Sequence, residues 1–173
     1  METLEEKAKK FKILNELAVK GETAVFGSDY LCDFPFYTFM QKRVSDYAVY
    51  NRSIEGLTVK EAKNVVEDCL KYLSPENILI SFGENEDLND EFYDNYKELI
   101  LKIRRLYKNA KLCILQTRGS DKACEERLKN LANELRVTFI PMTKNTESDK
   151  AVFGEMSSFF RHGKISFLDA FAV

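Results

Sequence analysis

The side chains best suited to chemistry in this sequence are a serine, its neighbouring aspartate, one amide and the only histidine. Ser28 and Asp29 follow one apolar run, Asn85 follows another, and His162 stands near the carboxyl end. A serine hydroxyl acts as a nucleophile when a base removes its proton, and an amide NH₂ can donate to a developing oxyanion. His162 is the one side chain that ordinarily titrates near neutral pH, so it is the natural candidate for that base.

Each of these residues also has a plain structural interpretation. Ser28 and Asp29 could cap a helix that follows a strand. Asn85 stands in an acidic run, residues 83–90, which would suit the positive end of a helix. His162 lies in a polar run and could be a surface residue. The residue types alone therefore leave the chemical and the structural interpretations open.

Apolar runs that suit buried strands alternate with helical patterns along the chain. The predicted strands are 23–26, 47–50, 77–82, 111–116 and 136–140, and the predicted helices between them are 36–43, 58–72, 90–106 and 121–135. Helices of this length can cross over between parallel strands. The pattern therefore predicts a three-layer α/β fold with a five-stranded, mostly parallel, doubly wound sheet of the flavodoxin-like type. In such sheets functional loops follow the carboxyl ends of strands, where Ser28, Asp29 and Asn85 stand.

Two further patterns concern helices and aromatic side chains. The first predicts an extra N-terminal amphipathic helix that ends near Gly21, from the apolar residues Leu4, Ala8, Phe11, Leu14 and Ala18. The second is an aromatic cluster, interpreted as core under a helix or as the lining of a pocket: Tyr30, Phe34, Phe36, Tyr37 and Phe39. The cations Lys102, Arg104, Arg105 and Lys108 are interpreted as a solvated helix face.

Length and composition limit the class of protein. A chain of 173 residues with 45% hydrophobic content predicts a single domain, residues 1–173. Because 26 basic side chains nearly balance 28 acidic ones, no nucleic-acid partner is expected. No segment has the apolar length of a signal peptide or a membrane span, so the expected location is cytoplasmic. The widely spaced cysteines, Cys32, Cys69, Cys113 and Cys124, predict buried thiols, with no metal and no cofactor.

Three segments that follow the first three predicted strands resemble, in order, the signature blocks of the SGNH/GDSL family of serine esterases and lipases. Residues 24–31 are similar to the first block, whose Gly-Asp-Ser carries the nucleophilic serine. Here the last two residues are exchanged, so alignment on Gly27 places Asp29, not Ser28, at the position of the family serine.

The second and third blocks resemble the family more closely. Residues 51–58 match the second block, and the resemblance implies that Gly56 supplies a backbone N–H to an oxyanion hole. Residues 79–86 resemble the third block, Gly-x-Asn-Asp, which implies Asn85 as another oxyanion donor, with Glu86 in place of the final aspartate. Together the three blocks cover about the first half of the chain and are moderately to strongly specific for the SGNH fold.

The final family block, Asp-x-x-His, is matched only in its histidine. Phe159 stands where the acid belongs, three residues before His162. Candidate substitutes for the acid are Asp149, Glu155 and Asp169. Because only eleven residues follow His162, we expect the N-terminal helix to cover the sheet face that a closing helix covers in the family.

The resemblance implies a hydrolase of small ester or acyl substrates, with carbohydrate esters as one class. It implies His162 as base and Gly56 and Asn85 as oxyanion donors. Ser28 can serve as nucleophile, with Asp29 as its neighbour, if the turn after Gly27 is rearranged by one residue. The exchanged motif and the missing acid leave a second interpretation open, a catalytically inactive protein that binds a ligand in the same cleft. The sequence does not indicate an oligomeric state.

Overall fold

The fold is built on one parallel sheet. The computed structural model describes residues 2–41, 47–142 and 148–160. Its strands are β1 (Thr23–Gly27), β2 (Val49–Asn51), β3 (Asn77–Ser81), β4 (Lys111–Leu115) and β5 (Thr138–Ile140). They lie in the order β2-β1-β3-β4-β5, and every neighbouring pair is parallel. The predicted five-stranded, doubly wound α/β fold is therefore confirmed.

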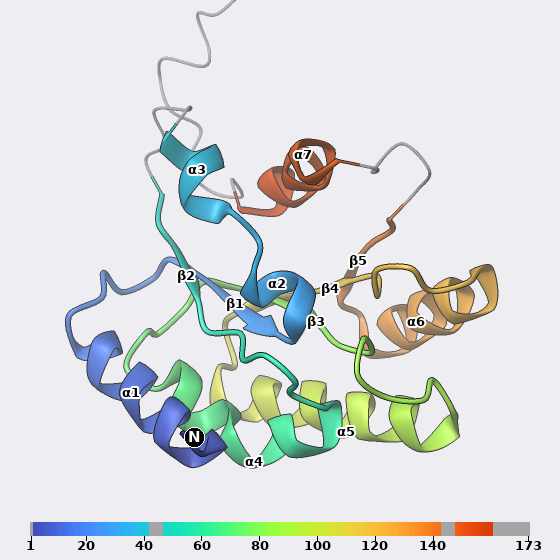
Figure 1. Cartoon of the computed structure of the whole chain (residues 1–173), viewed down its shortest axis with the longest axis horizontal. Coiled ribbons are helices and arrows are strands. Elements are labelled where there is room, and N and C mark those ends of the chain that lie inside the picture. The colour runs from blue at the N-terminus through green and yellow to red at the C-terminus, as the bar shows by residue number, and fades with distance from the viewer. Residues whose placement is uncertain (1, 42–46, 143–147, 161–173) are drawn as a thin grey trace, which may run out of the picture.

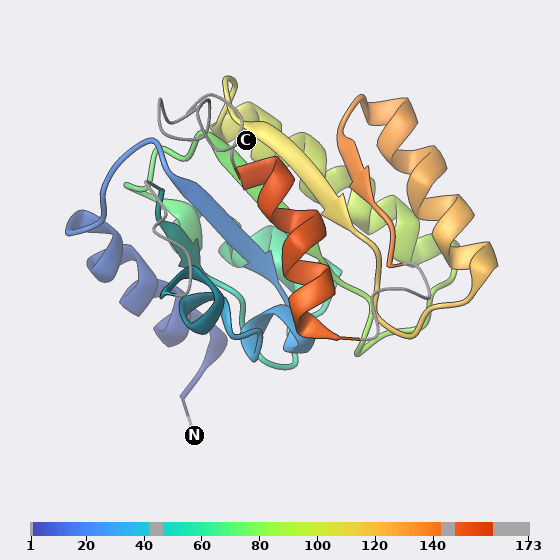
Figure 2. The same ribbon diagram turned by 90° about the horizontal axis from the view of Figure 1, so that it is seen from above.

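Helices cover both faces of the sheet (Figure 1). One face carries α4 (Val59–Leu70), α5 (Asp90–Leu106) and α6 (Lys122–Leu135), with α1 (Leu4–Glu16) beside α4. The other face carries α7 (Asp149–Phe160), together with α2 (Asp29–Cys32) and α3 (Phe36–Gln41). Figure 2 shows α7 lying across the middle of the sheet.

The strands supply apolar side chains to both faces because successive residues of a strand point in opposite directions. Phe26 and Ile78 belong to the core under α4 and α5, whereas Val25 and Leu79 belong to the core under α7. All four side chains are fully buried. Continuous apolar strands of this kind are typical of parallel sheets that are covered on both faces.

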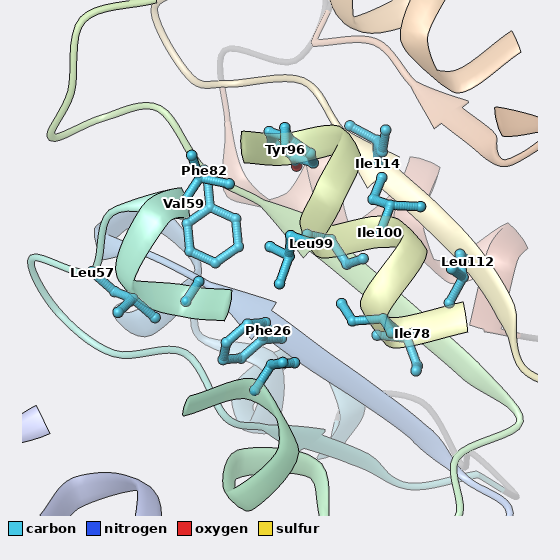
Figure 3. Packing of buried hydrophobic residues seen from close by; sticks show 14 of the residues in the cluster. Phe26, Leu57, Val59, Ile78, Phe82, Tyr96, Leu99, Ile100, Leu112 and Ile114 are labelled. Carbon is cyan, nitrogen blue, oxygen red and sulfur yellow. The ribbon is translucent and has the colours of Figure 1, made fainter. Parts of the chain in front are cut away.

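Aromatic rings fix the larger core at the end of β3 (Figure 3). The ring centroids of Phe26 and Phe82 lie 5.5 Å apart, and those of Phe82 and Tyr96 lie 6.0 Å apart, both in edge-on arrangements. Each such pair contributes about 0.5–1.5 kcal/mol beyond the burial of its surface. Because Phe82 lies three residues before Asn85, this packing also anchors the start of the loop that carries Asn85.

Capping side chains explain where the long helices begin. Thr58, Asn89 and Asp121 precede α4, α5 and α6, and each side chain accepts a hydrogen bond from a backbone N–H of the first turn. These bonds satisfy donors that have no partner inside the helix. The predicted starts of these helices are therefore correct within one residue.

The N-terminal helix α1 packs against α4 and not on the sheet. Asn15 is fully buried, donates to the carbonyl oxygens of Cys69 and Lys71 at 2.9 Å each, and accepts from Arg52 Nε at 2.7 Å. The expectation that this helix covers the second sheet face is wrong, because α7 covers that face. Leu14, predicted to face the core, is 54% exposed because the neighbouring Asn15 takes the buried position.

The structure also tests the expectations for the aromatic cluster, the cysteines and membrane-spanning segments. Phe34 and Phe36 are buried and Phe39 packs against them, as the core interpretation predicts, whereas Tyr37 is exposed. Tyr30 and Phe34 also line a cavity, as the pocket interpretation predicts. Three cysteines are buried free thiols and Cys32 is partly exposed. Within the described ranges, no helix is both long enough and apolar enough to cross a membrane.

β1 ends at Gly27, where neighbouring chain segments approach closely. A Cβ atom on Gly27 would lie 2.3 Å from Ser81 O and 2.9 Å from Leu31 Cδ1. Gly27 O accepts a hydrogen bond from Ile54 N–H at 3.0 Å, and Ser28 N–H donates to Ser81 O at 3.2 Å. The missing side chain therefore lets the segments after β1, β2 and β3 meet at Ser28.

Replacement of this glycine should weaken the fold. We expect Gly27→Ala to lower the free energy of unfolding by about 1–3 kcal/mol, because the clash is with a backbone carbonyl. Urea denaturation measures the change. Gly154→Ala on α7 is the control, since a Cβ there meets nothing within 4 Å, and it should gain about 0.5–1 kcal/mol. A Gly27→Ala protein as stable as the wild type would show that the close approach is not a real constraint.

Candidate active site

Ser28 lies at the carboxyl edge of the sheet, between β1 and α2. It is only 1% exposed, and Asn85 Nδ2 donates a hydrogen bond to its Oγ at 2.7 Å. Its side chain makes no capping bond to α2. Ser28 therefore stands at the N-cap position of α2, as one interpretation predicted, but its hydroxyl does not cap the helix and instead contacts the candidate oxyanion donor.

Asp29 points toward the segment after β2. Its Oδ1 accepts a hydrogen bond from the backbone N–H of Gly56 at 2.5 Å. Gly56 has a φ of +73°, a conformation that favours glycine. The N–H that the resemblance assigns to an oxyanion thus binds a carboxylate of the chain itself.

The loop after β3 holds Asn85 in place through its neighbours. Asn89, not Asn85, caps α5, with its Oδ1 accepting from Phe92 N–H at 3.0 Å. Glu86 Oε1 accepts from Val59 N–H at 2.7 Å, which ties this loop to the first turn of α4. Burial raises the pKa of Glu86, while the bond to Val59 opposes that rise. The residue in place of the family aspartate is therefore a positioning group.

A cavity of about 340 Å³ opens beside Asp29. Its lining includes four carboxylate residues, Asp29, Asp33, Glu84 and Asp149, and one guanidinium, that of Arg118. The acids follow different strands, since Glu84 comes after β3 and Asp149 begins α7 after β5. The cavity is therefore strongly acidic.

The Tyr30 ring lines this cavity and contacts two charged side chains. The Arg118 guanidinium carbon lies 4.7 Å from the Tyr30 ring centroid, and Arg118 Nη1 lies 3.8 Å from Asp149 Oδ1. The Tyr30 hydroxyl donates to the same carboxylate oxygen at 3.3 Å. Burial and the charge of Asp149 raise the pKa of Tyr30, so its hydroxyl stays protonated as a donor.

Glu84 is the least satisfied acid at this edge. Both oxygens of its carboxylate are buried and have no hydrogen-bond partner among the described side chains and backbone atoms. Burial raises its pKa above the ordinary value, its own backbone N–H opposes that rise, and the negative charges of Asp29 and Glu86 add to it. Asp29, by contrast, accepts a hydrogen bond from the Gly56 N–H.

The structure brings together four of the predicted groups: Ser28, Asp29, Gly56 and Asn85. His162 and Asp169 lie outside the described residues, and the described part of the chain holds no histidine. Phe159 lines a cavity with Lys111 and Thr138, the first residues of β4 and β5, so the described end of α7 lies at the opposite edge from Ser28 (Figure 2). The role of His162 as base stays a prediction.

Sequence reasoning missed the convergence of Glu84, Arg118 and Asp149. Each follows a different strand, which is the only signal the sequence offers for their proximity. Of the substitute acids, Asp149 lies at the cavity, whereas Glu155 is exposed on α7. Within the described ranges, no group of three or more histidine, cysteine or acidic side chains could hold a metal ion.

The buried Glu84 should make stability depend on pH. Its pKa in the folded protein exceeds the ordinary value of 4.5, so the folded state binds more protons between these two values. The free energy of unfolding contributed by Glu84 therefore falls as pH rises from about 4.5 through the raised pKa.

We expect Glu84→Gln to be more stable than the wild type at neutral pH, with a difference that shrinks in acid. Urea denaturation at several pH values measures both proteins, and Glu126→Gln, at an exposed position on α6, controls for the loss of one carboxylate. A difference between Glu84→Gln and the wild type that stays constant from acid to neutral pH would rule out this account.

Comparison with known proteins gives the fold but no sequence family. No family model matches the chain, and no curated protein matches it. Among solved structures, a protein assigned as a platelet activating factor from Streptococcus pneumonia superposes with a TM-score of 0.76 at 15% identity. That match covers 90% of this chain and 92% of the other.

Two further structures are similar over most of their length. A GDSL-like lipase from Bacteroides thetaiotaomicron has a TM-score of 0.59 at 14% identity, with 78% of this chain and 77% of that chain covered. A catalytic mutant of an acetylxylan esterase from Geobacillus stearothermophilus has a TM-score of 0.55 at 15% identity, with 79% and 82% covered. With the strand order and the groups at the carboxyl edge, these likenesses show that the chain has the SGNH hydrolase fold.

Proposed function

We propose that the protein hydrolyses small ester or acyl substrates at the carboxyl edge of its sheet. The observation that carries this proposal is the contact of 2.7 Å between Asn85 Nδ2 and Ser28 Oγ, which joins the candidate nucleophile to the candidate oxyanion donor. Ser28 Oγ is the acceptor in this bond, so its own O–H remains available to a base. The esterases and lipases among the similar structures support the proposal.

In the proposed reaction Ser28 Oγ attacks the carbonyl carbon of the substrate while a general base takes the hydroxyl proton. The resemblance assigns that role to His162. Because α7 ends at Phe160 by the amino edge of the sheet, and two residues span at most about 7 Å, catalysis by His162 requires that the end of α7 moves. Asn85 Nδ2 then donates to the oxyanion that forms, in place of Ser28 Oγ. Collapse of this intermediate expels the alcohol, which receives the proton, and water hydrolyses the acyl group from Ser28. Because Ser28 is 1% exposed, the reaction requires a movement that opens its hydroxyl to the substrate.

The acidic cavity favours neutral or cationic substrates. Carboxylates outnumber the single guanidinium of Arg118 around it, so a substrate with its own carboxylate or phosphate would be repelled. Neutral acetyl esters, including those of carbohydrates, meet this requirement. The similarity to an acetylxylan esterase is consistent with that class.

A fluorophosphonate probe tests the nucleophile. We expect it to label the wild type at Ser28 and to fail with Ser28→Ala, because the probe bonds to an activated serine oxygen. Turnover of p-nitrophenyl acetate should fall about 1,000-fold or more in Ser28→Ala. Ser158→Ala, at an exposed serine of α7, is the control and should behave as the wild type.

The same assays locate the base. Loss of ester turnover in His162→Ala would support the proposed reaction. Absence of labelling and of turnover in the wild type from about pH 5 to about pH 9 would exclude hydrolysis through Ser28.

A second candidate function, binding without catalysis, is favoured by the position of Asp29. Its carboxylate already occupies the N–H of Gly56 at 2.5 Å, as an oxyanion would in an active enzyme. A negative charge there opposes the development of a second one nearby. We therefore propose as the alternative a catalytically inactive SGNH-fold protein that binds a small ligand in this cleft.

An oxyanion analogue distinguishes the two candidates. If Asp29 blocks the Gly56 N–H, benzylphosphonate should bind the wild type about tenfold or more weakly than Asp29→Ala, since the variant frees the donor and removes a like charge. Isothermal titration calorimetry measures both affinities. Asp33→Ala is the matched control, because it removes a charge from the same cavity without freeing Gly56. Equal affinity of the wild type and Asp29→Ala would contradict the blocked site.

A further inference from the structure

A second concave surface lies away from the candidate active site, over the carboxyl end of α5 and the amino edge of β4 and β5. It consists of two cavities, of about 640 and 480 Å³, that share Arg104. The first is lined by the cations Lys63, Lys102, Arg104, Arg105 and Lys108, and the second adds Lys111 and Arg136. We call these residues together the basic groove.

The positive charge of the basic groove is poorly compensated. Glu98 is its only acidic lining residue, and it pairs with Lys63 at 2.5 Å. Lys102 Nζ donates to the carbonyl of Lys63, and Arg104 donates to the carbonyl of Leu135, the last residue of α6, so both engage uncharged acceptors. Because the whole chain has a net charge of -2, this concentration of cations is a local feature and not an average property.

Helix-end preferences explain only part of the basic groove. Arg104 and Arg105 lie in the last turn of α5, where cations offset the helix dipole. Lys63, by contrast, comes from the middle of α4, Lys111 begins β4, and Arg136 follows α6. Cations from four separate elements thus converge on one surface. The sequence pattern predicted only a solvated face on one helix.

Arg136 gives an independent reason to regard the basic groove as a binding surface. It has a φ of +53° in the left-handed region, at a helix end where glycine or asparagine is the usual residue. An arginine pays a conformational cost for this backbone, yet its side chain lines the groove. The position therefore keeps a cation where a glycine would suit the backbone better.

The shape and chemistry of the groove select the class of partner. It is concave and includes the part-exposed Leu101, which suits a chain segment better than a flat lipid surface. Its one aromatic lining residue, Phe159, is 3% exposed, so it offers no ring for stacking nucleic-acid bases. We propose that the basic groove binds an acidic segment of a partner protein that also carries apolar side chains.

Fluorescence anisotropy tests the proposal with a labelled peptide of about ten residues that alternates Glu pairs with Leu. The full chain should bind it, and the peptide with every Glu replaced by Gln should bind at least about tenfold more weakly. Binding of the Glu peptide should weaken as the salt concentration rises, because salt screens the charges. Arg105→Glu/Lys108→Glu should lose about tenfold or more in affinity.

Matched variants separate a local site from a general charge effect. Lys122→Glu/Lys129→Glu, on exposed positions of α6 outside the groove, makes the same change in net charge and should leave binding unchanged. Arg136→Gly should weaken binding of the Glu peptide, while the midpoint of urea denaturation stays equal or rises. A purely structural role of Arg136 would not produce weaker binding without a loss of stability.

Three outcomes would overturn the proposal. One is no binding of the Glu peptide by the wild type, and another is equal weakening by the two double variants. The third is tighter binding of a single-stranded RNA of similar charge, or of phosphatidylglycerol vesicles, which would assign the groove to a different partner. None of these outcomes depends on ester hydrolysis at Ser28.

Discussion

At Gly27 the backbone of β1 approaches the Ser81 carbonyl of β3 so closely that no side chain fits between them. This approach fixes the direction of the two residues that follow. Ser28 turns inward toward Asn85, and Asp29, one residue later, turns toward Gly56. Because the turn is fixed, the exchange of serine and aspartate relative to the family motif changes the chemistry at each position. The hydroxyl meets the amide donor, and the carboxylate meets the backbone donor.

The exchange of serine and aspartate changes the electrostatics of the carboxyl edge. Asp29 brings a negative charge to an edge where Glu84 is already buried without a partner, and the pKa of Glu84 rises partly for that reason. An oxyanion at the Gly56 N–H would be a further negative charge beside a cavity whose only guanidinium, that of Arg118, lies beside Asp149. Substrate binding that displaces Asp29 from Gly56 would relieve this repulsion. Displacement of Asp29 from Gly56 is therefore the step that separates catalysis in this cleft from binding alone.

The strands were predictable from the sequence because a sheet covered on both faces needs continuous apolar runs, and those runs are present. The helix α7 was not predicted, although its segment carries a helical apolar pattern, Val152, Phe153, Met156, Phe159 and Phe160. The burial of Asn15 was not predictable, since its partners are carbonyls of α4 and the side chain of Arg52. Gly56 and Asn85 were found because they follow strands, whereas the acids around Arg118 meet only through tertiary structure.

The two edges of the sheet carry opposite charge. Acidic side chains gather at the carboxyl edge, where strand ends and the amino ends of α2 and α7 meet, and the basic groove lies at the amino edge. Negative groups at helix amino ends and positive groups at helix carboxyl ends are favourable, so part of this separation follows from the parallel α/β topology itself. That explanation covers Asp29 and Asp149, which begin α2 and α7, and Arg104 and Arg105 near the end of α5. It does not cover Glu84, which precedes α5 by several residues, or Lys111, which begins a strand. Each edge thus holds charged groups that topology leaves unexplained, and a nearly neutral chain can present two surfaces of opposite charge to different ligands.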